Sequence, residues 1–157
     1  MTTISEAAPD VFSICSYLEQ IDVWFRQFLI RDEQSPPYNA GTRRMFQRVR
    51  DAVAEVVDPA SLRWIAVSHV WADECGGLND WLREAPSQAA CSAYGALVSA
   101  GDYARGKVRP LGARETLLVG SHRLRFLATP HLPRGVVRRR TSAPGALAVL
   151  YNASAEI

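Results

Sequence analysis

The chain has 157 residues, of which 48% are hydrophobic and 22% charged, and its net charge is only +2 at pH 7. This length suits one domain with a substantial buried core, and so small a charge gives no support for nucleic acid or an anionic membrane as the main partner. No apolar run reaches the roughly 18–20 residues that span a bilayer. The N-terminus also lacks a basic region before its apolar part, so we expect a cytoplasmic protein.

The first half of the chain indicates a strand region followed by one helix. Residues 11–30 predict one or two strands, and the prolines within 32–37 then predict a turn. Thr42 is a candidate cap for a helix over 43–57, where apolar residues recur at three- and four-residue spacing. The candidate inward positions of this half are Trp24, Phe28, Ile30, Met45, Phe46, Val49, Val53, Val56 and Val57.

The second half alternates short strands with helices. Residues 62–67, LRWIAV, predict a buried strand because they are β-prone and nearly continuous in apolar residues. The other expected elements are a helix at 78–82, a strand at 89–92, a helix at 94–100, a loop over 102–114 and a hairpin at 116–129 that turns at Gly120 and Ser121. Such alternation predicts a layered α/β fold.

The segment Ser68–Gly77, SHVWADECGG, follows the predicted strand directly and concentrates candidate metal ligands. An extended backbone would place His69, Trp71 and Asp73 on one face, with Glu74 turned away unless the chain bends. A histidine and a carboxylate at the carboxyl end of a buried strand form half of a metal site, and the two glycines would let the backbone approach an ion. In the alternative interpretation, His69 hydrogen-bonds a backbone carbonyl and Asp73 caps the next helix.

Several segments in this order resemble the metallo-β-lactamase superfamily, and more narrowly the oxygen-binding di-iron domain of flavodiiron proteins. They are WFRQFLIRDE, GTRRMFQRVRDAV, LRWIAVSH, GGLNDWL and HRLRFLATPHLP. The resemblance implies an α/β fold that is a partial metallo-β-lactamase-like αββα sandwich, mainly its N-terminal half. Residues 1–134 would form this domain, and 135–157 an atypical tail with one strand at ALAVLY.

The resemblance also implies a site for two iron ions at the top of the sheets. In that branch the strand-end motif reads H-x-E-x-D followed by His or Glu, so His69, Asp73 and Glu74 match its ligand positions. The loop TPHLPRG matches the region that supplies the next histidine, which makes His131 a further candidate ligand. An external flavin or rubredoxin-like protein would donate electrons.

Departures from the family pattern predict that this metal site is impaired. Trp71 stands where the family has a carboxylate, and an indole cannot bind a cation; we expect its bulk to press into the metal pocket. Arg134 places a permanent positive charge at a histidine position of that loop. The later aspartate and histidine of a full domain are absent, so the chain resembles a truncated copy, and its change in character after Arg134 is typical of a shifted reading frame.

We therefore expect a metallo-β-lactamase-fold protein that resembles di-iron oxidoreductases and has weak or no activity. One alternative is a non-catalytic truncated remnant or interaction module with no metal bound. Another is a zinc-dependent hydrolase, in which the metal activates water, although the usual HxHxDH set is absent. Half a sandwich would expose an apolar face, so we expect self-association. His122, in the hairpin turn, is expected to be an exposed residue without a special role.

Overall fold

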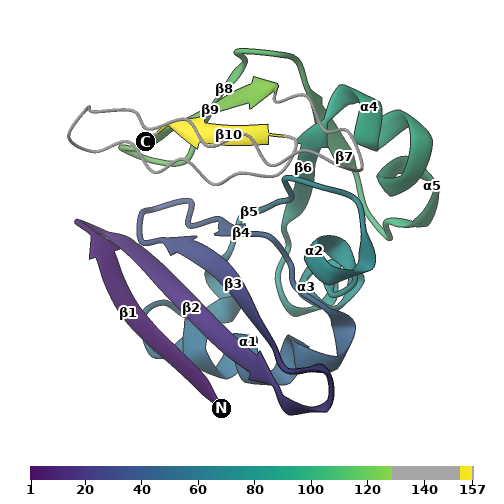
Figure 1. Cartoon of the computed structure of the whole chain (residues 1–157). Coiled ribbons are helices and arrows are strands. Elements are labelled where there is room, and N and C mark those ends of the chain that lie inside the picture. The colour runs from purple at the N-terminus through teal and green to yellow at the C-terminus, as the bar shows by residue number, and fades with distance from the viewer. Residues whose placement is uncertain (129–152, 157) are drawn as a thin grey trace.

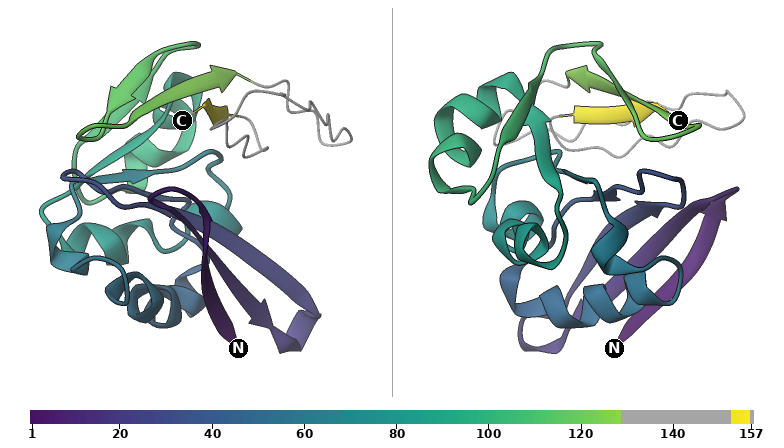
Figure 2. Two further views of the ribbon diagram at one scale, coloured as in Figure 1. Left: turned by 90° about the vertical axis from the view of Figure 1, so that its left-hand side faces the viewer. Right: turned by 180° about the vertical axis from the view of Figure 1, so that it is seen from behind.

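The protein is built as two β-sheets and one layer of helices, as shown by a computed structural model that describes residues 1–128 and 153–156 (Figure 1). The larger sheet has seven strands in the order β1-β2-β3-β4-β5-β6-β7, and the smaller has three in the order β10-β9-β8. The helices pack on one face of the larger sheet and the smaller sheet packs on the other (Figure 2). This is the layering expected of a partial αββα sandwich, with three of its four layers present in the described residues.

The strands are β1 (Thr2–Ala8), β2 (Val11–Leu18), β3 (Val23–Ile30), β4 (Pro37–Tyr38), β5 (Trp64–Ala66), β6 (Gln88–Ser92), β7 (Val108–Leu111), β8 (Thr116–Leu118), β9 (Arg123–Ala128) and β10 (Ala153–Glu156). The helices are α1 (Phe46–Ala54), α2 (Ala72–Cys75), α3 (Leu78–Glu84), α4 (Ala93–Gly95) and α5 (Gly101–Tyr103). Shorter helical turns are η1 (Glu19–Ile21), η2 (Arg43–Met45), η3 (Pro59–Ser61) and η4 (Ala96–Ala100). Strands β1 to β4 pair antiparallel and β4 to β7 pair parallel. No helix among the described residues is long and apolar enough to cross a membrane.

The predicted strand region at 11–30 is an antiparallel hairpin of β2 and β3. Ile30 is buried as expected, at 2% exposure, and Phe28 packs against the same core. The expectation for Trp24 is wrong, because this side chain is 54% exposed. It lies near the far end of the hairpin, where it packs on Tyr17 with ring centroids 4.9 Å apart.

The predicted helix at 43–57 is present as η2 followed by α1, and it ends before Pro59. Its buried residues are Met45, Val49, Ala52 and Val53. Thr42 stands at the start of η2, but its hydroxyl makes no capping hydrogen bond. That oxygen is buried without a hydrogen-bond partner in the described part of the chain, so the predicted cap is wrong.

The central strands of the larger sheet, β5 and β6, are buried on both faces. The core on its helical side contains Met45, Val49, Val53, Leu62, Ile65, Val67, Leu78 and Trp81. The core between the two sheets contains Val11, Ile30, Ala66, Ala90, Leu111, Leu117, Val119, Leu124 and Phe126. Ile65 and Ala66 therefore face opposite layers, which explains why LRWIAV is nearly continuous in apolar residues. The smaller sheet covers the face that we expected to be exposed, so any self-association needs another surface.

The second half differs from its prediction in two places. The helical segment continues without a break from α4 through η4 and α5, so Gly101 does not end it. The expected loop over 102–114 contains β7. We missed this strand because its charged residue and Pro110 interrupt the apolar pattern of a strand. Proline is tolerated there because β7 is an edge strand. The predicted hairpin is present as β8 and β9, with Gly120 at φ +94°. The segment ALAVLY lies outside the described residues, and β10 follows it.

Candidate functional site

The segment after β5 bends into a helical turn rather than continuing as an extended loop. Trp71 is extended, with φ −83° and ψ 157°, and α2 begins at the next residue. The amides of Glu74 and Cys75 donate to the carbonyl of Trp71 at 3.0 and 2.8 Å, which closes this turn. The bend leaves Asp73 exposed and turns Glu74 inward, so the segment is not the extended loop that we expected.

Glu74 is a largely buried carboxyl group held by neighbouring donors. Its Oε2 lies 2.6 Å from Ser68 Oγ, and the backbone amide of His69 also donates to it. Burial raises the pKa of Glu74 to about 7, the charge of Asp73 adds to this, and the hydrogen bonds from Ser68 and His69 oppose it. Near neutral pH this carboxyl group is therefore partly protonated.

The hydroxyl of Ser68 connects Glu74 to Asn39. Asn39 Oδ1 accepts from the backbone amide of Ser68 at 3.0 Å and lies 2.9 Å from Ser68 Oγ. A serine hydroxyl has one proton and cannot donate to both Asn39 and Glu74 at once. A protonated Glu74 removes this conflict, because it donates to Ser68 while Ser68 donates to Asn39. Asn39 has φ +66°, a conformation that asparagine tolerates, and it was not predicted as part of this network.

The aromatic ring of Trp71 packs on His69. The two ring centroids lie 4.6 Å apart with the rings inclined by 64°. Trp71 is 57% exposed, and its indole lies beside His69, the first candidate ligand. His69 is half-buried beside the indole.

The glycines at the end of the segment bring two loops together. Gly77 donates its amide to the carbonyl of Gly41 at 2.9 Å, and Gly41 donates to the carbonyl of Glu74 at 3.0 Å. A Cβ on Gly77 would lie 2.8 Å from the Ala40 carbonyl oxygen, so a larger residue does not fit. The same carbonyl accepts from the indole of Trp81 at 3.2 Å. These glycines thus permit close backbone packing, where we expected an approach to an ion.

The donor set in the described residues does not fit a two-iron centre. Across 1–128 and 153–156, no three His, Cys, Asp or Glu side chains are placed to hold a metal ion. Of the candidate ligands, His69 packs against Trp71, Asp73 is exposed, and Glu74 is hydrogen-bonded to Ser68 and a backbone amide. His131 and Arg134 lie outside the described residues.

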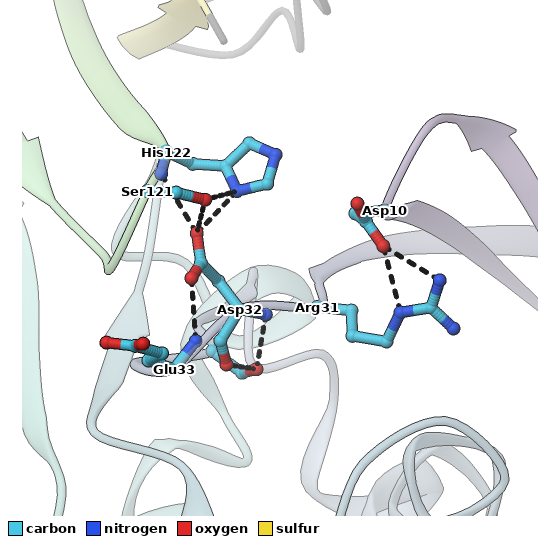
Figure 3. A network of polar contacts seen from close by, with 7 residues as sticks. Asp10, Arg31, Asp32, Glu33, Ser121 and His122 are labelled. Carbon is cyan, nitrogen blue, oxygen red and sulfur yellow. Dashed lines mark hydrogen bonds and ion pairs between the residues drawn. The ribbon is translucent and has the colours of Figure 1, made fainter.

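A second polar cluster forms where the sequence predicted none. His122 is half-buried, so its expected exposure is wrong. Its Nδ1 lies 2.5 Å from Asp32 Oδ2, and its backbone amide donates to the same oxygen at 2.9 Å (Figure 3). Ser121 Oγ donates to this oxygen at 2.9 Å, and the amide of Glu33 donates to Oδ1 at 2.7 Å. The cluster fastens the β8–β9 turn to the loop after β3.

Asp32 is held as an anion. Burial alone would raise its pKa, but the side chain of His122 and the amides of Glu33, Ser121 and His122 together hold the pKa of Asp32 well below its usual range. Ser121 Oγ lies 3.5 Å from the same His122 nitrogen that faces Asp32. A nucleophilic triad requires the serine and the acid on different ring nitrogens. The cluster therefore has the residue types of a catalytic triad, but their arrangement is that of a structural hydrogen-bond network.

Comparison with solved structures gives the same fold. Rubredoxin oxygen:oxidoreductase from Desulfovibrio gigas matches with a TM-score of 0.71 and 16% identity over 80% of this chain and 35% of that one. The flavodiiron protein from Giardia intestinalis matches at 0.69 and 13% identity over 83% and 35%. A metallo-β-lactamase from Cronobacter sakazakii, described as a HARLDQ motif mutant, matches at 0.68 and 20% identity over 83% and 56%.

These likenesses show the predicted metallo-β-lactamase-type fold, resembling the flavodiiron core. The chain spans about a third of the length of the two flavodiiron-type structures and about half of the lactamase. No family model matches the chain, and neither does any curated protein.

Proposed function

We propose that this protein is a metallo-β-lactamase-fold domain with an impaired metal site, acting as a non-catalytic module rather than as an oxygen reductase. Its similarity to di-iron proteins supports an origin in a metal-binding fold. The observation that carries the proposal is the position of Glu74. Its carboxyl group is turned inward and accepts hydrogen bonds from Ser68 and from the amide of His69, which engage the lone pairs that a metal ion would need. Metal ligands must be deprotonated and must direct a lone pair at the ion.

The proposal also covers the expected ligands outside the described residues. His131 could add one donor to His69 and Asp73, but three groups are too few for two metal ions. The HARLDQ motif named for the Cronobacter protein has a histidine and an aspartate at the spacing of His69 and Asp73. Its last residue is an amide where this chain has Glu74. Motifs that depart from HxHxDH therefore occur on this fold.

The test is anaerobic loading of the full chain with ferrous iron, followed by desalting and metal analysis. We expect well under one iron per chain in the native protein. In Trp71→Glu a carboxylate returns to the position where the family has one, and iron retention should rise if only this ligand is missing. Trp24→Glu is the matched control, because Trp24 is exposed to a similar degree but lies on the β2–β3 hairpin.

Two results would contradict the proposal. One is two irons per native chain together with oxygen consumption driven by a reduced flavin or rubredoxin-like donor, which would establish the di-iron oxidoreductase. The other is tight zinc binding with hydrolytic activity, which would establish the zinc hydrolase. Background iron in the native chain and in both variants would show that Trp71 alone does not account for the lack of binding.

A further inference from the structure

The outer edge of the larger sheet offers an unused row of backbone hydrogen-bonding groups. Strand β1 is the last strand of its sheet, and among the described residues it pairs only with β2 (Figure 1). The carbonyl of Met1 accepts from the amide of Tyr17 at 2.9 Å, so these two form a hydrogen-bonded pair. Such pairs alternate along antiparallel strands. Thr2 and Ile4 therefore direct their amides and carbonyls away from β2, toward the free edge.

A groove of about 600 Å³ runs between this edge and α1. It is lined by Met1, Thr2, Thr3 and Ile4 on the strand and by Arg48, Asp51, Ala52 and Glu55 on and beside the helix. Successive strand residues point to opposite faces of a sheet. A groove that is lined by four successive strand residues must therefore reach the free edge of β1. Helix α1 lies along the same side of the sheet, beside β1 and β2 (Figure 2).

The helical wall of this groove has a positive charge at one end and a negative charge at the other. Its residues are three, four and seven positions apart, so they share one face of the helix. Arg48 and Glu55, at the two ends of the wall, are both exposed and form no ion pair within the described chain. Asp51, between them, already accepts from Gln47 at 2.8 Å and lies 3.6 Å from Arg50.

We propose that a second copy of this chain binds here, with β1 pairing antiparallel to the partner's β1 about a two-fold axis through Thr3. Thr2 then exchanges backbone hydrogen bonds with the partner's Ile4, and the symmetry repeats this pair. An axis perpendicular to the sheet also sets α1 antiparallel to the partner's α1 on the same face. Arg48 then faces the partner's Glu55, and Glu55 faces the partner's Arg48.

The arrangement favours a second copy over an unrelated peptide because it is self-complementary. A two-fold axis between positions 51 and 52 of the wall pairs 48 with 55, so each unpaired charge meets its opposite. Thr3, Asp51 and Ala52 all line this groove, so one two-fold axis can relate both the strands and the helices. The rest of β1 is protected, because its pairing with β2 shifts register between Glu6 and Ala8. Such bulges limit further edge pairing.

Sedimentation velocity on the full chain at tens of micromolar tests this interface. We expect a dimer whose dissociation constant rises at least about tenfold in Arg48→Glu and in Glu55→Arg, since each opposes like charges. The double variant Arg48→Glu/Glu55→Arg restores the pairs in reverse and should return within about threefold of the native value, given the modest energy of exposed pairs. Arg105→Glu is the matched control, because Arg105 is exposed on the loop after α5 and its side chain forms no ion pair with the described residues.

Circular dichroism of each variant separates loss of the interface from loss of the fold. A monomeric native chain at these concentrations would overturn the proposal. It would also fail if Arg105→Glu weakened the dimer as much as Arg48→Glu, or if the double variant stayed as weak as the single ones. None of these outcomes depends on whether the protein binds metal, so the proposal and the proposed function can fail separately.

Discussion

The segment after β5 has candidate ligands that are close together in the sequence, whereas the cluster around Asp32 is formed by residues that are far apart in it. The first gathers His69, Asp73 and Glu74 within six residues, yet it forms no metal cluster in the described chain. The second joins Asp32 to a turn about 90 residues away, with no motif to announce it. Residues that are close in sequence were separated by one turn of helix, and residues far apart were brought together by the packing of two sheets.

The comparison shows that a ligand pattern has meaning only with the backbone that presents it. In the segment after β5, the bend into α2 turned one carboxyl group inward and another outward. In the Asp32 cluster, the backbone amides of Ser121 and His122 in the β8–β9 turn both point at one carboxylate. We therefore expect the Asp32 cluster to contribute strongly to stability, and Glu74 to reduce stability as it ionises.

Of these substitutions, Asp32→Asn should change the free energy of unfolding most. A small change would contradict the view that the Asp32 cluster stabilises the fold. We expect the free energy of unfolding to fall by about 3 kcal/mol or more, because a neutral amide cannot satisfy the donors around a buried anion. Asp10→Asn is the control. Its ion pair with Arg31 is 43% and 52% exposed and should contribute under about 1 kcal/mol. Urea denaturation of both variants at pH 7 measures the difference, and equal losses would contradict this account.

The same carboxylate predicts the acid end of the stability profile. The folded pKa of Asp32 is lower than its ordinary value of 3.8. Its contribution is therefore complete above that value and is lost as pH falls below it. The native chain should lose stability below about pH 4 more steeply than Asp32→Asn does. Parallel profiles for the two chains would contradict this expectation.

Glu74→Gln should have the opposite sign and a different pH window. The folded pKa of Glu74 is raised from 4.5 to about 7, so the folded state binds the proton more tightly. The native chain should therefore lose stability as pH rises from 4.5 to 7, by a total of about 3 kcal/mol. The glutamine variant should lack this slope and be more stable than the native chain at pH 8. Asp73→Asn, exposed on the same turn, should change stability by less than about 0.5 kcal/mol.

Gly77→Ala tests whether the segment after β5 is a packing element. The added methyl group would lie 2.8 Å from the Ala40 carbonyl oxygen, so we expect a loss of about 2 kcal/mol. Gly106→Ala is the control, since its added carbon would come no closer than 3.9 Å to Leu82. Thermal denaturation followed by circular dichroism compares the two. An unchanged midpoint for Gly77→Ala would show that the two loops are not tightly packed.

Thr42→Val should give the smallest change, and it should stabilise the fold. The hydroxyl of Thr42 is buried without a partner in the described residues, so its removal should raise the free energy of unfolding by about 1 kcal/mol. Thr116→Val on the exposed face of β8 should be nearly neutral. A destabilised Thr42→Val would mean that the hydroxyl has a hydrogen-bond partner in solution.

Periodicity predicted the elements whose burial follows a simple pattern. The apolar spacing of α1, the continuous run of β5 and the β8–β9 hairpin all had clear signals. The predicted burial of Trp24 was wrong because an alternating strand can extend beyond the core. Strand β7 was missed because an edge strand needs few apolar residues. The inward turn of Glu74 depends on a four-residue helix, too short to leave a periodic signal. His122 gained its partner only through the docking of two sheets, which no local pattern records.

The central claim is that Glu74 is a buried structural acid and not a metal ligand. Its most direct test is a pH titration of Glu74 in the full chain, monitored by the NMR chemical shift of its carboxyl carbon. If this group is a buried structural acid bound to Ser68, its midpoint should lie near pH 7 and should not move when zinc is added. A midpoint near the ordinary carboxyl value of 4.5 would show that Glu74 is not a buried acid, and a midpoint that zinc lowers would show that it binds metal; either result would contradict the account.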